Sequence, residues 1–156
     1  MKRHLLALTL LSLFNFVWPV AAQDLALSVV GEERHIKLSL ADLDAMPQES
    51  FNTTTIWTEG SDTFSGVPLS YVLNLAEHSG SVLRMVALND YSVEMPIADI
   101  GDTYPIVATR MNGEPMKVRD KGPFWIIYPY GSDAKYQTET TYARSIWQLV
   151  TLSVKE

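Results

Sequence analysis

The sequence contains no cysteine among its 156 residues. This absence excludes disulfide bonds, thiolate metal sites and cysteine nucleophiles, so the stability of the fold has to come from packing. Histidine is scarce as well: beyond the N-terminal segment only His35 and His78 occur, and their separation does not resemble the spacing of metal ligands. His78 lies near the C-terminus of a predicted helix, where it interacts favourably with the helix dipole. We therefore predict no metal site.

Positive charge is also in short supply, since 12 Lys and Arg residues face 18 Asp and Glu residues and the formal net charge is −6. An acidic surface repels phosphate backbones, which argues against nucleic-acid binding. The sequence lacks a Gly-x-Ser-x-Gly nucleophile turn, a phosphate-binding loop and a dinucleotide fingerprint. These absences give no support to a serine hydrolase or a nucleotide-dependent enzyme.

Long apolar runs are limited to the N-terminus. A basic segment at residues 2–4 precedes the apolar run Leu5–Val17, and small residues follow up to Ala22. These three parts are typical of a secretory signal peptide. The run is shorter than the roughly 20 residues that a bilayer-spanning helix needs. We therefore predict a signal peptide over residues 1–22 with cleavage after Ala22, a single domain over residues 23–156, a periplasmic or secreted location, and no stable membrane span after processing.

Beyond the predicted cleavage site the sequence pattern is mainly that of short strands. Runs that alternate between apolar and polar residues are separated by Gly, Asn, Asp and Pro, which favour turns. Asn112-Gly113 is the strongest hairpin signal, and the run from Phe124 to Tyr128 is too continuously apolar for an edge strand. The predicted strands cover residues 25–30, 34–38, 53–58, 83–88, 91–95, 106–110, a short return strand at Pro115, 124–128 and 146–154.

Two short helices complete the prediction. Residues 39–46 begin with Ser39, a favourable N-cap, and end before Pro47. Residues 69–78 follow a predicted tight turn at Phe64–Pro68, and their apolar residues recur on one helical face. The combination predicts an α+β fold, as a single β-rich domain with mixed sheets and two short helices.

Polar and aromatic residues gather near the ends of the predicted strands, where side chains can converge on a cleft. An aromatic wall with one or two arginines suits a planar or anionic small molecule. Alternatively, each Tyr or Trp is a half-buried core residue with its polar tip in solvent. Arg144 is the best single candidate, because it follows a polar loop at residues 131–141 that would form a mouth or lid. The candidates are Trp57, Asp90, Tyr91, Arg110, Tyr128, Tyr130, Tyr142 and Arg144.

Five segments carry a family resemblance. They are Phe64–Leu73, Ala87–Tyr91 followed by Met95-Pro96, Met111–Met116, Gly122-Pro123 with Tyr128-Pro129, and Ala143–Leu149. Their order and spacing resemble those of the sulfite-oxidase-type molybdopterin-binding domain, in its small exported bacterial members that stand alone. The resemblance implies the fold of that family over nearly all of the predicted domain.

The resemblance also implies where a metal ligand would lie. In catalytic members of the family, a cysteine ahead of the Gly-x-Pro-Leu turn ligates molybdenum, and the corresponding place falls within Thr53, Thr54 and Thr55. A threonine hydroxyl is a hard, poorly acidic ligand that cannot replace a soft thiolate. Arg144 and Ser145 match a segment near the pterin phosphate, so Ser145 joins the candidate ligand-binding residues. We expect no catalytic residue and no cofactor, because molybdopterin, the cofactor that the resemblance suggests, would lack its cysteine ligand.

Three functions remain open at the level of the sequence. The preferred one is a non-catalytic exported module that binds a small anionic or planar molecule, or a membrane-bound sensor protein, on a molybdopterin-binding scaffold. The second is a molybdopterin-dependent oxidoreductase that holds its cofactor without a cysteine. The third is an accessory protein that docks on a membrane receptor through its acidic surface. The missing cysteine, together with Trp57, Arg144 and the family's turns, favours the first.

Overall fold

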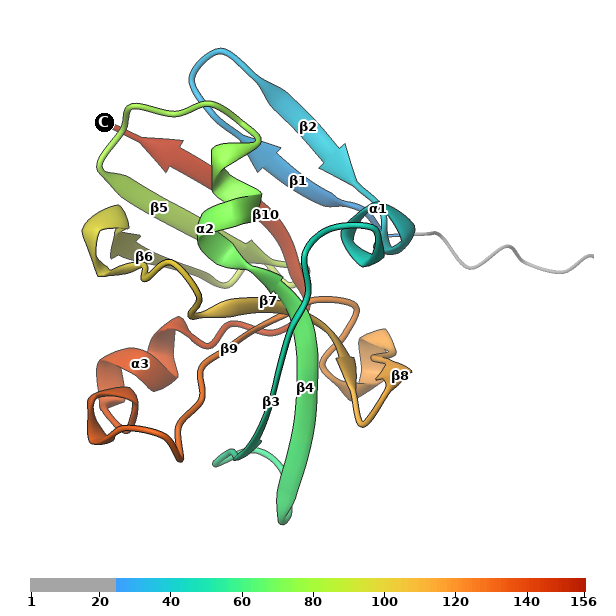
Figure 1. The fold of residues 1–156 in the computed structure, drawn as a ribbon. Coiled ribbons are helices and arrows are strands. Elements are labelled where there is room, and N and C mark those ends of the chain that lie inside the picture. Colours follow the sequence, from blue (N-terminus) through green and yellow to red (C-terminus); the bar gives the residue numbers. More distant parts are fainter. Residues whose placement is uncertain (1–24) are drawn as a thin grey trace, which may run out of the picture.

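The computed structural model describes residues 25–156, so the signal peptide predicted for residues 1–22 lies outside the described residues. Two β-sheets form the body of this part of the chain (Figure 1). None of its helices is long and apolar enough to cross a membrane. The strands are β1 (Leu27–Val30), β2 (His35–Leu38), β3 (Glu49–Thr54), β4 (Ser61–Pro68), β5 (Val82–Ala87), β6 (Ser92–Pro96), β7 (Ile106–Met111), β8 (Glu114–Pro115), β9 (Trp125–Ile127) and β10 (Leu149–Lys155). The helices are α1 (Leu40–Asp44), α2 (Leu69–Asn74) and α3 (Glu139–Arg144), with short 3-10 turns η1 (Ile97–Asp99), η2 (Val118–Asp120) and η3 (Ala134–Tyr136).

The two sheets differ in the direction of their strands. The first has the order β2-β1-β10-β5-β6 and is mixed, because β1 and β10 run parallel while the other pairs are antiparallel. The second has the order β3-β4-β7-β8, and β9 also pairs with β7. Figure 1 shows the long β3–β4 hairpin extending away from the first sheet, with α3 near β9. The predicted α+β class with mixed sheets is confirmed.

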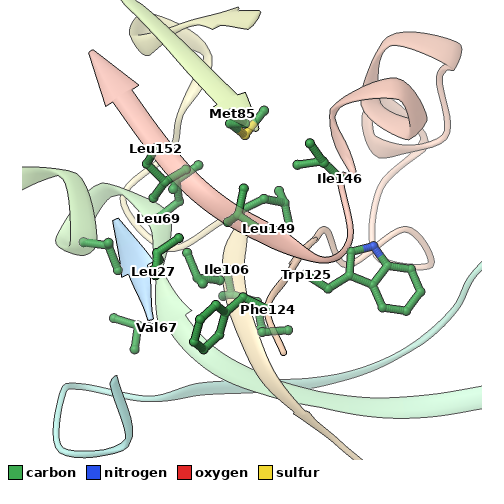
Figure 2. Close-up of a cluster of buried hydrophobic side chains, with 14 of the residues drawn as sticks. Leu27, Val67, Leu69, Met85, Ile106, Phe124, Trp125, Ile146, Leu149 and Leu152 are labelled. Carbon is green, nitrogen blue, oxygen red and sulfur yellow. The ribbon is translucent and has the colours of Figure 1, made fainter. Parts of the chain in front are cut away.

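The core receives apolar side chains from both sheets and from α2. Figure 2 shows Leu69 of α2 beside Leu149 and Leu152 of β10, with Ile106 of β7 close by. The largest fully buried side chain is that of Trp125 in β9, which lies at the edge of this cluster. The packing that a cysteine-free chain requires is therefore supplied by aliphatic residues at the centre and aromatic residues at one end.

Several local predictions are confirmed by the backbone. Ser39 caps α1 through a capping box, in which its hydroxyl accepts the N–H of Asp42 and its own N–H donates to the Asp42 carboxylate. Asn112 and Gly113 form the hairpin between β7 and β8 with φ of 54° and 84°, as a left-handed two-residue turn requires. These signals are local, so the surrounding fold does not override them.

The predicted tight turn at Phe64–Pro68 is wrong, because these residues belong to β4. This strand pairs with β3 on one side and β7 on the other. A Cβ atom on Gly66 would lie only 2.0 Å from the carbonyl oxygen of Val107, so glycine allows the two backbones to approach. Pro68 ends the strand and directly precedes α2 instead of starting the helix. The strand propensity of the segment thus prevails over its turn residues.

Three other boundaries differ from the prediction. The strand predicted for residues 53–58 is β3, which ends at Thr54 because the Thr55 hydroxyl accepts the N–H groups of Trp57 and Thr58 and closes a turn. The helix predicted to reach His78 ends at Asn74, and Glu77 adopts a left-handed φ of 49°. The loop predicted at residues 131–141 contains η3 and the start of α3.

The expectation that residues 124–128 avoid an edge position is also wrong. β9 pairs with β7 alone among the strands. Its other side is covered by the segment that leads into β10, since the N–H of Ile126 donates to the carbonyl of Ile146 (3.0 Å) and the N–H of Leu149 donates to the carbonyl of Phe124 (3.0 Å). This covering segment lies where the sequence predicted the start of the last strand, which begins only after Gln148 with its φ of 51°.

Replacing Gly66 by alanine tests the close approach of β4 and β7. We expect Gly66→Ala to lower the free energy of unfolding by about 3 kcal/mol, because the new methyl group meets backbone that has to shift. Gly113→Ala is the matched control: its Cβ would meet nothing within 4 Å, and its positive φ costs about 1 kcal/mol. Urea denaturation measures both values, and equal losses in the two variants would contradict the close approach.

Candidate functional site

An aromatic cluster forms around Trp57, which lies in the turn closed by Thr55. Its ring makes edge-on contacts with Trp125 and Trp147, each at a centroid distance of 5.7 Å. Tyr142 lies at 5.9 Å and Tyr130 at 6.3 Å from the same ring. Edge-to-face contacts of this kind add to the stabilisation that burial provides. The cluster therefore fixes the position of Trp57 although the turn that carries it is not part of a sheet.

A pocket of about 390 Å³ opens beside this cluster, and we call it the aromatic pocket. None of its lining side chains is charged. Two of the aromatic side chains are exposed, Tyr91 at 51% and Trp147 at 37%. The residues that define its walls are Trp57, Tyr91, Tyr142, Ser145, Ile146 and Trp147. A pocket with this volume and lining has the size and character of a small-molecule site.

The position of Trp147 is fixed by Lys121, which contacts its ring, and by the backbone hydrogen bond of the next residue, Gln148. The ammonium group of Lys121 lies 5.9 Å from the Trp147 ring centroid and 5.8 Å from that of Trp125. The N–H of Gln148 donates to the carbonyl of Lys121 at 3.1 Å, and both residues have left-handed φ values, 51° and 72°. Non-glycine residues in this conformation are strained, and such strain gathers at ligand sites. The exposed rim of the pocket is thus well defined in position.

Ser145 forms part of the wall, but its hydroxyl is already satisfied. It accepts the hydrogen bond of the Tyr130 hydroxyl at 2.6 Å and donates to the carbonyl of Thr141 at 2.8 Å. The carbonyl of Ser145 accepts the indole N–H of Trp125 at 3.0 Å. Burial raises the pKa of Tyr130 well above its usual value, although the hydrogen bond to Ser145 acts in the opposite direction. Ser145 therefore organises the wall and keeps no free hydroxyl for a ligand.

A second pocket of about 430 Å³ lies at another face of α3, and we call it the polar pocket. Its side chains come from η1 and the segment after it, from Tyr128 directly after β9, and from the region of η3 and α3. Arg144 and Asp99 form an ion pair there, with Nη1 and Oδ2 2.9 Å apart. The lining side chains that bear on its chemistry are Asp99, Tyr104, Tyr128, Lys135, Tyr136 and Arg144.

The expectation that the predicted site residues share one cleft is wrong. The aromatic pocket brings together Trp57, Tyr91 and Ser145, with Tyr142, while Tyr128 and Arg144 line the polar pocket. Their role in ligand binding stays a prediction for each pocket separately.

Three of the predicted residues line neither pocket. Tyr130 is buried, and its hydroxyl donates to Ser145 in the wall of the aromatic pocket. Arg110 makes a bidentate ion pair with Asp44, and this pair joins β7 to the end of α1. The hydrogen bond to Asp44 raises the pKa of the guanidinium. Asp90 is exposed in the turn between β5 and β6, with a φ of 65°. These residues therefore have structural explanations.

The three threonines at the predicted metal position do not provide a metal site. Thr53 is buried, and its hydroxyl accepts the N–H of Gly131 at 3.2 Å. Thr54 is exposed, and the Thr55 hydroxyl closes the turn before Trp57. Over residues 25–156, no group of three or more His, Cys, Asp or Glu side chains could hold a metal ion. With hydroxyls alone at this place, the residues present do not fit a molybdenum centre that is ligated by the protein.

Sequence reasoning missed several residues that define the pockets. The sequence pattern places Ile146 and Trp147 at the start of the last predicted strand, which hides their position on a pocket wall. Lys135 and Tyr136 lie in the predicted loop at residues 131–141, and Asp99 lies between two predicted strands. The left-handed conformation of Gln148, which turns Trp147 out of the strand, has no signal in the residue type.

Comparisons with known proteins agree with the fold. The family described as oxidoreductase molybdopterin binding domain matches residues 15–135. The crystal structure of the sulfane dehydrogenase SoxCD from Paracoccus pantotrophus aligns with a TM-score of 0.65 and 19% sequence identity. The alignment covers 85% of this chain and 38% of that chain, so this chain spans well under half of the other protein, and the likeness shows the fold alone. A search of curated protein sequences finds no match.

Tyrosine ionisation tests the burial of Tyr128, which lines the polar pocket, and of Tyr130, which bonds to Ser145 in the wall of the aromatic pocket. Burial raises the pKa of Tyr128 to about 12 and that of Tyr130 further, whereas an unfolded tyrosine ionises near pH 10. An absorbance titration should therefore show that part of the phenolate forms only at a pH above that at which an unfolded tyrosine ionises. Tyr128→Phe and Tyr130→Phe should each reduce the amount of phenolate that forms at this higher pH. Because the folded state holds the proton longer, the stability from these groups is complete below pH about 10 and is lost as the pH rises towards 12. A single early transition for all tyrosines would contradict this burial.

Proposed function

The chain belongs to the family of oxidoreductase molybdopterin-binding domains, and from this premise we propose that it is a non-catalytic module that binds a small planar molecule in the aromatic pocket. The observation that carries the proposal is an uncharged pocket of about 390 Å³ with Trp and Tyr rings on its walls. Ring faces attract flat, polarisable molecules, and a few polar groups at the rim orient them.

The exposed rings distinguish a ligand site from ordinary core packing. Trp57 and Tyr142 pack against other aromatic rings, so their places are explained by the fold itself. Tyr91 and Trp147 instead expose a large share of their surface to solvent beside the pocket. Exposed apolar surface next to a cavity is typical of a binding site. A planar ligand between these rings would cover the surface that the fold leaves open.

The chemistry of the chain supports a role without catalysis. Redox chemistry at a thiolate-bound metal requires a cysteine, and the sequence has none. Thr53 and Thr55, at the place that the resemblance assigns to the metal ligand, use their hydroxyls in hydrogen bonds of the fold. The scaffold of the family is thus combined with side chains that favour binding over electron transfer.

We further propose that the module works outside the cytoplasm, as the N-terminal sequence indicates. A small-ligand module in that compartment would report the presence of its ligand to a membrane-bound sensor protein. The acidic composition, with a net charge of −6, favours a sensor with a basic docking face.

Ligand binding is tested on protein expressed from the complete sequence. We screen free pterins, flavins and indole and benzoate derivatives by thermal shift and by quenching of tryptophan fluorescence. Trp147→Ala should weaken binding of the best compound roughly tenfold, because a ring that stacks on it is lost. Tyr71→Ala is the matched control, since Tyr71 is 39% exposed and lies outside the aromatic pocket. Binding by no compound in the screen, or equal effects of the two variants, would rule out the aromatic pocket.

Metal content separates this function from an oxidoreductase. Protein isolated from the periplasm of its native host should contain molybdenum only at the level of the buffer blank, because no residue provides a thiolate. The mass of the same sample should correspond to a chain that begins at Gln23. Stoichiometric molybdenum would establish the oxidoreductase instead, and a full-length chain in the cytoplasm would contradict export.

A further inference from the structure

The polar pocket differs in chemistry from the aromatic pocket and shares no lining residue with it. It has a volume of about 430 Å³ and combines charges of both signs with three tyrosine rings. Its negative charge is that of Asp99, and its positive charges are those of Arg144 and Lys135. A cavity of this size accepts a small organic molecule, and its charges decide which kind.

The ion pair in this pocket leaves hydrogen-bonding capacity on both partners. Within the described part of the chain, the Arg144 guanidinium makes one hydrogen bond, from Nη1 to Oδ2 of Asp99. A guanidinium has more N–H donors than this bond uses, in a planar fork that matches a carboxylate. Asp99 accepts that bond on one carboxylate oxygen, and its side chain is 49% exposed. Arg144, at 19% exposure, is the more enclosed of the two.

Tyr128 adds a buried hydroxyl at the same pocket. The residue is 6% exposed, and the partner of its hydroxyl is the sulfur atom of Met95 at 3.9 Å, a weak acceptor. A buried hydroxyl without a good acceptor has lost the hydrogen bonds that water gave it. Burial raises the pKa of Tyr128, with Arg144 acting in the opposite direction, so the hydroxyl stays protonated and is able to donate. A ligand oxygen in the pocket supplies the missing acceptor.

From this arrangement we infer that the polar pocket is a second ligand site, which binds a small zwitterion of the free amino-acid class. The ligand carboxylate pairs with the free donors of Arg144 and accepts the hydrogen bond of Tyr128. The ligand ammonium pairs with Asp99, and the ligand side chain packs against Tyr104 and Tyr136. The inference does not depend on the aromatic pocket.

A ligand that carries charge of only one sign matches the polar pocket less well than a zwitterion does. An anion without an ammonium group would bring a second negative charge close to Asp99, and a cation without a carboxylate would bring a further positive charge close to Arg144 and Lys135. A zwitterion places each of its charges beside an opposite charge. The direct Arg144–Asp99 contact is kept, and the ligand adds one contact of the same kind to each partner.

A purely structural role for the ion pair explains only part of these observations. The pair joins α3 to η1 across the pocket, but partly exposed ion pairs contribute little to stability. This role gives no reason for the weakly bonded hydroxyl of Tyr128 or for the cavity that the tyrosine rings enclose. Ligand binding accounts for both.

Calorimetric titration tests the inference on protein expressed from the complete sequence. Each of the twenty free L-amino acids is titrated, followed by two analogues of the best binder, one without its carboxylate and one without its amino group. We expect the amino acid to bind at least roughly tenfold more tightly than either analogue, because each analogue loses one charge-assisted contact. No heat from any amino acid, or equal affinity of the analogue that lacks the amino group, would overturn the inference.

Two conservative variants assign the contacts. Tyr128→Phe should weaken the best amino acid roughly tenfold through loss of one hydrogen bond to a charged group, while Tyr71→Phe should leave it unchanged. Asp99→Asn should weaken the amino acid by a similar factor but not the analogue without an amino group. Thermal melting confirms that each variant is folded. Unchanged affinity for the amino acid in both variants would place its binding elsewhere and overturn the assignment. The affinity of planar compounds for the aromatic pocket should be the same in both variants as in the unmodified protein.

Discussion

The buried indole of Trp125 is the contact on which the arrangement of the site depends. Its ring packs against Phe64 of β4 at 5.5 Å and against Trp57 in the neighbouring turn at 5.7 Å. Its N–H donates to the carbonyl of Ser145, directly after α3. One side chain thus joins the second sheet, the turn after β3 and the segment after α3. Because a buried indole needs both apolar contact and a hydrogen-bond acceptor, these three segments have to meet at one place.

The position of α3 follows from this contact and in turn defines both pockets. Tyr142 and Ala143 contribute to the aromatic pocket, and Thr141 and Arg144 to the polar pocket. The hydroxyl of Ser145 bonds to Tyr130 and to Thr141, so the end of α3 is tied to the turn that follows β9. A short helix has little stability of its own. Its tertiary hydrogen bonds and the aromatic cluster therefore keep the walls of the two pockets in fixed positions.

The sequence predicts those parts of the fold that depend on local chemistry. Asn112-Gly113 and the capping box of Ser39 are set by residue type and spacing, and both are found as predicted. The strand at Phe64–Pro68 and the helix α3 were missed, because pairing with β7 and packing against the aromatic cluster are contacts between distant residues. For the site, the residue types were predicted but not their grouping. Which strand ends face the same cavity depends on sheet order, and a single sequence does not contain that order.

The threonine hydroxyls at the place that the resemblance assigns to a metal ligand take part in hydrogen bonds of the fold. Thr53 bonds to the backbone of Gly131, and Thr55 closes the turn that presents Trp57. Both are hydrogen bonds of the folded chain, so this region is held without coordination to an ion. The turn that they stabilise carries the central ring of the aromatic cluster. In this chain the region therefore contributes to the fold by positioning the ring of Trp57 in the wall of the aromatic pocket.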